Sequence, residues 1–289
     1  KNFRLAQLLF GCMALASTAC LRKNQSQVEQ SRAIQNERDK PVDQVQTTRV
    51  STGGIIDLGR INAILAHRPG NPVKGLLIIS PGAKIPADKM VNLASKFARV
   101  GYPTFVIEYL ANLAIIPTEQ KKALELAGKI RRGEKLKGIP EQIERSLDSG
   151  ASISLLGHSM GGAVLAGLAD DEQASFLKRI LLVGVSSVVS APVIAKAKVP
   201  ISLLVGSEDG LVTQGRANEP SNEKKEMEDL LQRRSVMLQG VNHFCILDDE
   251  NTGDAKKRAE EKKYGYGRAS ISQDECQYRL VDSVLSEGI

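Results

Sequence analysis

Six residues near the middle of the chain could hold a reactive serine. The run Gly157-His158-Ser159-Met160-Gly161-Gly162 follows the apolar residues 153–156 and precedes the small-residue stretch 163–169, so a strand is expected to turn sharply into a helix at Ser159. Such a turn strains the serine backbone, and glycines beside it prevent a Cβ atom from colliding with the neighbouring strand and helix. The pattern predicts a nucleophilic Ser159, although a glycine-rich turn without chemistry has the same letters.

A serine nucleophile needs a base, because its hydroxyl is barely ionised at neutral pH. The chain has only three histidines. His67 stands beside a turn early in the chain, and His158 is next to Ser159 but is expected to point away from it. His243 directly follows the last apolar strand, where a loop can return over the strand ends. His243 is therefore the predicted base, with a purely structural histidine as the alternative.

The base needs a carboxylate that holds its tautomer and stabilises the imidazolium. The apolar residues 201–205 run into an acidic turn that contains Glu208 and Asp209. Asp209 is favoured because the adjacent glycine releases the backbone, while Glu208, Asp248 and Asp249 are weaker candidates and a solvated turn aspartate is the structural alternative. The predicted triad is thus Ser159, Asp209 and His243.

Negative charge on the substrate oxygen must be met by fixed donors. The backbone N–H of Met160, which follows the nucleophile at a helix start, is one expected donor. The second is expected from the turn Pro81-Gly82-Ala83-Lys84 after the strand at 76–80, with the Ala83 N–H preferred. An ordinary strand-to-helix turn is the competing interpretation of that segment.

These loops require a scaffold in which apolar strands alternate with helices. Strands are expected at 61–66, 76–80, 104–108, 152–156, 180–185, 201–205 and 235–238, and helices at 87–100, within 121–147, after Ser159, at 223–233 and at 273–285. The alternation predicts an α/β fold with a mostly parallel central sheet covered by helices on both faces, as a single domain over 49–289. The loops that carry chemistry then gather at the carboxyl ends of the strands.

Six segments in this order resemble the α/β-hydrolase superfamily, and within it the dienelactone-hydrolase-like subgroup also called α/β-hydrolase fold-5. They are Pro81-Gly82-Ala83, Asn112-Leu113-Ala114-Ile115, Gly157-His158-Ser159-Met160-Gly161-Gly162, Gly206-Ser207-Glu208-Asp209-Gly210, Gly240-Val241-Asn242-His243 and Ala269-Ser270-Ile271-Ser272. The order Ser159, Asp209, His243 is the order of that superfamily. The resemblance implies the α/β-hydrolase fold and hydrolysis of an ester.

Two departures limit what the resemblance implies. Dienelactone hydrolase itself uses a cysteine nucleophile where this chain has Ser159. A charged insertion at 248–263 replaces the short glycine-rich segment that usually follows the histidine. Residues 112–116 are expected either to line the site as a wall or small cap, or to begin a buried helix.

The expected reaction is hydrolysis of a small-molecule carboxylic ester through an acyl-enzyme on Ser159, with no metal or organic cofactor. The same triad serves many acyl groups, so thioester or peptide hydrolysis is an alternative. A catalytically inactive hydrolase fold that acts as an envelope binding protein is another.

The first residues have the layout of a bacterial export signal. Lys1 and Arg4 precede a short apolar stretch, and residues 17–20 are small and end at Cys20. Residues 1–19 are expected to be a lipoprotein-type signal peptide, with lipid on Cys20. Cleavage at Cys12 and ordinary signal cleavage are the alternatives. Residues 20–48 are polar and are expected to be a tether, so the protein should sit in the cell envelope with a lipid anchor as its only membrane contact.

Charge and cysteine content narrow the function classes. The net charge is +6, and since residues 1–19 carry two basic residues and no acidic one, +4 remains without them. Basic and acidic residues are interspersed, so nucleic acid is not an expected partner. Cys245 and Cys276 are either a disulfide or two unpaired core thiols, and two cysteines without further ligands make a poor metal site.

Overall fold

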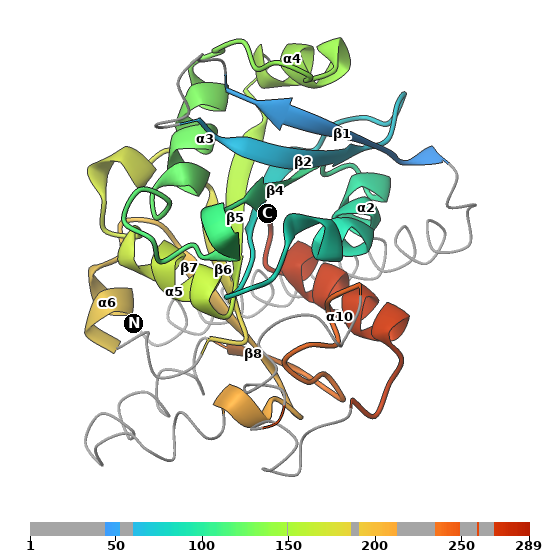
Figure 1. Ribbon diagram of the computed structural model, residues 1–289, viewed down its shortest axis with the longest axis vertical. Helices are drawn as coiled ribbons and strands as arrows, with labels where there is room; N and C mark the ends of the chain where they lie inside the picture. Colours follow the sequence, from blue (N-terminus) through green and yellow to red (C-terminus); the bar gives the residue numbers. More distant parts are fainter. Residues whose placement is uncertain are drawn as a thin grey trace, which may run out of the picture. The chain divides into compact units, whose positions relative to one another are not determined.

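One mixed sheet organises the domain (Figure 1). Within the described residues eight strands pair in the order β1-β2-β4-β3-β5-β6-β7-β8. The pairs β1 with β2 and β2 with β4 are antiparallel, and the pairs from β4 through β8 are parallel. The predicted α/β class with a mostly parallel sheet is therefore confirmed.

The computed structural model describes residues 44–52, 60–148, 150–185, 191–212, 235–248, 259 and 269–289. The predicted signal segment, Cys20 and most of the predicted tether lie outside these ranges. The helix expected at 223–233 and nearly all of the charged insertion also lie outside them. Residues Asp43–Ile289 form one compact unit.

The strands are short, and the central ones are buried along nearly their whole length. They are β1 Gln46–Ser51, β2 Asn62–His67, β3 Gly75–Ser80, β4 Thr104–Glu108, β5 Ser152–His158, β6 Arg179–Val183, β7 Ile201–Gly206 and β8 Ser235–Leu238. All six residues of β3 are buried. Near-continuous apolar strands of this kind are stable only when helices cover both sheet faces.

Helices cover the two faces, as predicted (Figure 1). Helices α2 (Val91–Arg99) and α10 (Gln273–Ser286) pack against each other, and α2 also packs on β2 and β4. Helices α3 (Lys122–Arg131), α5 (Met160–Gly167) and α6 (Ala191–Lys196) lie on the opposite face. Helix α4 (Glu141–Asp148) precedes β5.

Two elements differ from the sequence-based expectation. Strand β1 begins at Gln46, so the domain starts earlier than the predicted residue 49 and the last residues of the predicted tether belong to the sheet. β1 is a polar edge strand in which only Val50 is buried. The sequence therefore contains no apolar run that would predict a strand there. Helix α6 has only six residues, so it is too short to show a helical repeat of apolar residues in the sequence.

Within the described ranges, no helix combines the length and apolar character that crossing a bilayer requires.

Candidate active site

Ser159 lies in a strained turn between β5 and α5. Its backbone has φ 51° and ψ −123°. Among the described residues, Ser159 is one of four non-glycine residues with positive φ. Such a conformation costs on the order of 1–3 kcal/mol and persists where the surrounding structure imposes it. The sharp strand-to-helix turn expected at this serine is present.

Glycines allow this turn to press against neighbouring backbone. A Cβ atom on Gly161 would lie 2.3 Å from the carbonyl oxygen of Ser80 and 2.4 Å from that of Pro81. A Cβ atom on Gly157 would lie 2.4 Å from the Cα of Gly162. The first turn of α5 therefore touches the end of β3 directly, and this close approach is why the positions flanking Ser159 are glycine.

Asp209 and His243 form a buried contact at the ends of β7 and β8. Nδ1 of His243 lies 2.9 Å from Oδ2 of Asp209, and the two side chains are 4% and 2% exposed. Oδ1 of Asp209 accepts the N–H of Val212 at 3.0 Å. A carboxylate bound to Nδ1 fixes the imidazole orientation and leaves Nε2 as the nitrogen suited to base chemistry.

Opposing effects set the protonation of Asp209. Burial favours the neutral carboxyl, but the charge of His243 and the hydrogen bonds from His243 and Val212 outweigh it and lower the pKa of Asp209. Asp209 is therefore an anion at neutral pH and can stabilise a positive imidazole. Glu208, one of the weaker candidates, accepts the N–H of Ser270 at 2.8 Å, whereas Asp249, another, lies outside the described residues.

Ser159 and the Asp209–His243 pair meet at the end of β6. The N–H of Ser159 donates to the carbonyl of Val183 at 2.9 Å. A Cβ atom on the next residue, Gly184, would lie 3.0 Å from Oδ2 of Asp209 and 3.1 Å from Nδ1 of His243. The three residues predicted from widely separated segments thus surround one strand end.

The predicted oxyanion donors also lie beside Ser159. Met160 is the first residue of α5, so its N–H belongs to the helix end that lacks internal acceptors. A Cβ atom on Gly82 would lie 3.1 Å from the Cβ of Ser159, and this places the neighbouring Ala83 at the same edge. Within the described part of the chain, no acceptor takes the N–H of Ala83.

The segment after β4 packs against that loop. The N–H of Lys84 donates to the carbonyl of Asn112 at 2.8 Å. Ala111 and Asn112 both have positive φ, and the buried carboxylate of Glu119 accepts the N–H of Leu110 at 2.8 Å. Residues 110–112 form the 3₁₀ turn η3 (Leu110–Asn112). Residues 113–116, the rest of the segment expected to be a wall, a small cap or a buried helix start, follow it as turns without a helix.

His158 is a site residue whose role sequence reasoning missed. It is fully buried, and its Nε2 lies 2.9 Å from the carbonyl oxygen of His243. The two imidazole rings are 4.8 Å apart between centroids. A carbonyl can only accept, so Nε2 carries the proton and His158 connects the serine turn to the base. Its only sequence signal is its position next to Ser159, and that position predicts only that the side chain points away from the serine.

Burial makes His158 a source of acid sensitivity. Desolvation lowers the pKa of His158 from 6.5 to about 3. Between these two pH values the imidazole is protonated in the unfolded chain but neutral in the folded protein. The free energy of unfolding should then fall as the pH drops through this interval, by on the order of 1 kcal/mol per pH unit from this group. His158→Gln should remove that contribution in urea unfolding measured at several pH values.

The same series on His67→Gln measures a second buried histidine, whose pKa burial also lowers and which makes no part of the Asp209–His243 pair. An acid slope that is the same in wild type and His158→Gln would contradict this assignment.

Cys245 and Cys276 are joined as a disulfide, with a Cα–Cα distance of 6.0 Å. The bridge links the segment after His243 to α10. Among the residues that the structure describes, no group of three or more His, Cys, Asp or Glu side chains could hold a metal ion.

No family model matches the chain. No curated protein matches it either. Among solved structures, a dienelactone hydrolase from Anabaena variabilis is 14% identical, with a TM-score of 0.48, over 77% of this chain and 98% of that one. A putative dienelactone hydrolase from Klebsiella pneumoniae subsp. pneumoniae is 12% identical, with a TM-score of 0.46, over 76% and 95%. These two structures are therefore what the chain is similar to in fold.

Proposed function

We propose that the protein is a serine hydrolase that cleaves carboxylic esters. The observation that carries the proposal is the 2.9 Å contact between His243 and Asp209 beside a serine held at positive φ. A buried, oriented Asp–His pair next to a strained serine is the arrangement that acyl transfer requires. A hydrolase-like fold alone would leave the chemistry open.

The proposed reaction has two halves. His243 takes the proton of Ser159 as the serine oxygen attacks the ester carbonyl, and the N–H groups of Met160 and Ala83 bind the oxyanion. The C–O bond to the alcohol breaks, and His243 protonates the leaving alcohol. Water, deprotonated by His243, then attacks the acyl-enzyme and releases the carboxylic acid together with Ser159.

A panel of p-nitrophenyl esters from acetate to long acyl chains tests this function. We expect hydrolysis with an initial burst of nitrophenol, because the acyl-enzyme forms before water releases it. The acyl length with the highest kcat/KM reports the depth of the acyl site. Thioester and peptide substrates run beside the esters identify a different acyl preference, and turnover of none of them would support an inactive binding protein.

We further propose that the protein is exported to a bacterial cell envelope and anchored by lipid on Cys20. Support comes from the basic, apolar and small-residue sequence of residues 1–20 and from the polar stretch behind it. In a bacterial host, the wild type should incorporate labelled fatty acid and fractionate with membranes. Cys20→Ala should lose the label, whereas a labelled Cys20→Ala would move the site to Cys12.

A further inference from the structure

The residues that follow His243 form a buried loop without regular structure of its own. Residues 244–247 are at most 6% exposed. Buried backbone groups need hydrogen-bond partners, and here side chains supply them in place of a sheet or helix ladder. We call residues 244–248 the base arm, because they continue directly from the proposed base.

Helix α10 supplies several of those partners. Nε2 of Gln277 donates to the carbonyl of Ile246 at 3.1 Å, and Nε2 of Gln273 donates to the carbonyl of Leu247 at 2.8 Å. The Cys245–Cys276 disulfide adds a covalent link between the base arm and the same helix. One side of the base arm is thereby fixed.

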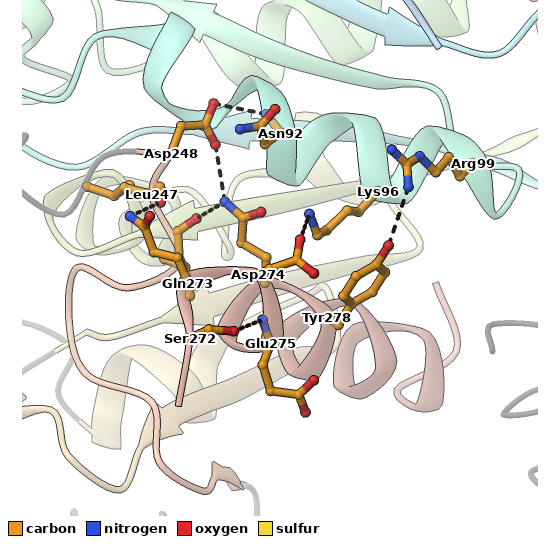
Figure 2. Close-up of polar contacts among 12 residues, drawn as sticks. Asn92, Lys96, Arg99, Leu247, Asp248, Ser272, Gln273, Asp274, Glu275 and Tyr278 are labelled. Atoms are coloured by element: carbon orange, nitrogen blue, oxygen red, sulfur yellow. Dashed lines mark hydrogen bonds and ion pairs between the residues drawn. The ribbon is translucent and has the colours of Figure 1, made fainter. Parts of the chain in front are cut away.

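Asp248 fixes the far end of the base arm to a different helix (Figure 2). Its Oδ2 accepts the backbone N–H of Asn92, in the first turn of α2, at 2.9 Å, and its own N–H donates to the carbonyl of Lys89 at 2.8 Å. Its Oδ1 accepts Nε2 of Gln277 at 3.1 Å. One carboxylate therefore ties the base arm to both α2 and α10.

The contact also completes α2. The residue before this helix, Met90, makes no side-chain cap. An anionic oxygen on a first-turn N–H fills that role and interacts favourably with the helix dipole. Burial raises the pKa of Asp248, while the hydrogen bonds from Asn92 and Gln277 favour its charged form.

We propose that Asp248 is a positioning residue for His243: by locking the base arm onto α2 and α10, it sets where the imidazole lies relative to Ser159. This rests on the proposed function. A base displaced by a fraction of an ångström loses rate without losing substrate affinity. Asp248 touches no reacting atom and so acts only through the base arm.

Two substitutions of Asp248 and a matched control test the proposal. Asp248→Ala should lower kcat for p-nitrophenyl butyrate by about tenfold with little change in KM. Asp248→Asn keeps an acceptor for Asn92 but turns a donor toward Gln277, so it should lower kcat by about threefold. The control is Asp274→Ala, which removes a 70% exposed carboxylate that pairs with Lys96 across the same two helices (Figure 2) and should leave kcat unchanged.

A second readout does not depend on catalysis. The proton between His243 and Asp209 should give a downfield NMR signal in the wild type, and that signal should shift or broaden in both Asp248 variants but not in Asp274→Ala. If the wild type turns over no ester, the proposed function fails, and the NMR series still tests the positioning.

Wild-type kcat and an unchanged signal in folded Asp248 variants would overturn the proposal. An equal loss in Asp274→Ala would overturn it too, since it would indicate general loosening of the two helices. Circular dichroism checks that each variant is folded. If Asp248→Ala is unfolded, the kcat and NMR signal of Asp248→Asn test the proposal.

Discussion

Ser159→Ala should lower kcat/KM for ester hydrolysis by at least about a thousandfold, because no other group can form the acyl-enzyme. The substitution keeps the Cβ atom and so leaves the strained turn in place. Removing one member of a cooperating triad abolishes most of its effect, since the remaining members have nothing to activate. Steady-state assays with p-nitrophenyl butyrate measure the loss.

Ser154→Ala is the matched control for this substitution. Ser154 lies on β5, the strand that leads into the Ser159 turn, and it is 1% exposed. Its hydroxyl has no hydrogen-bond partner within the described residues. Deleting it should leave kcat/KM unchanged and raise the stability by up to about 1 kcal/mol. Equal activity in Ser159→Ala and Ser154→Ala would contradict the role of Ser159.

Asp209→Asn should lower kcat by about ten thousandfold while the protein stays folded. An amide can turn its NH₂ group toward Nδ1 of His243, which favours the wrong tautomer, and it no longer balances the positive imidazole. The shape of the site should survive, because the two side chains are nearly isosteric. A kcat comparison at constant pH measures the effect, and KM should change little.

Glu208→Gln tests whether the neighbouring carboxylate shares this role. Its Oε2 accepts the N–H of Ser270, and glutamine retains an acceptor oxygen there. We expect kcat within about threefold of the wild type. A larger loss in Glu208→Gln than in Asp209→Asn would reverse the assignment of the acid.

The sequence could predict the parts of the site that depend on chain order. Strand-to-loop transitions place Ser159, Asp209 and His243 after three different strands, and a parallel sheet brings those strand ends to one edge. The scarcity of histidine left few choices of base. Residue type and topology together were therefore enough to nominate these three residues.

Contacts between segments remote in the chain could not be predicted in this way. The sequence predicts Asp248 only as a weaker triad candidate, yet its carboxylate caps a helix at Asn92, 156 residues earlier in the chain. The contact of His158 with His243 could not be predicted either, because it depends on how two loops pack against each other. Ala111 and Asn112 adopt positive φ with no glycine to signal it. Such features arise from packing and have no local pattern.

Labelling with a fluorophosphonate probe, followed by peptide mapping, tests the central claim most directly. The probe reacts only with a serine that an adjacent base has activated. We predict that the wild-type protein is labelled on Ser159 alone, that labelling falls sharply in His243→Gln, and that Ser159→Ala is not labelled. A folded wild-type protein that stays unlabelled, or is labelled on a different residue, would contradict the account.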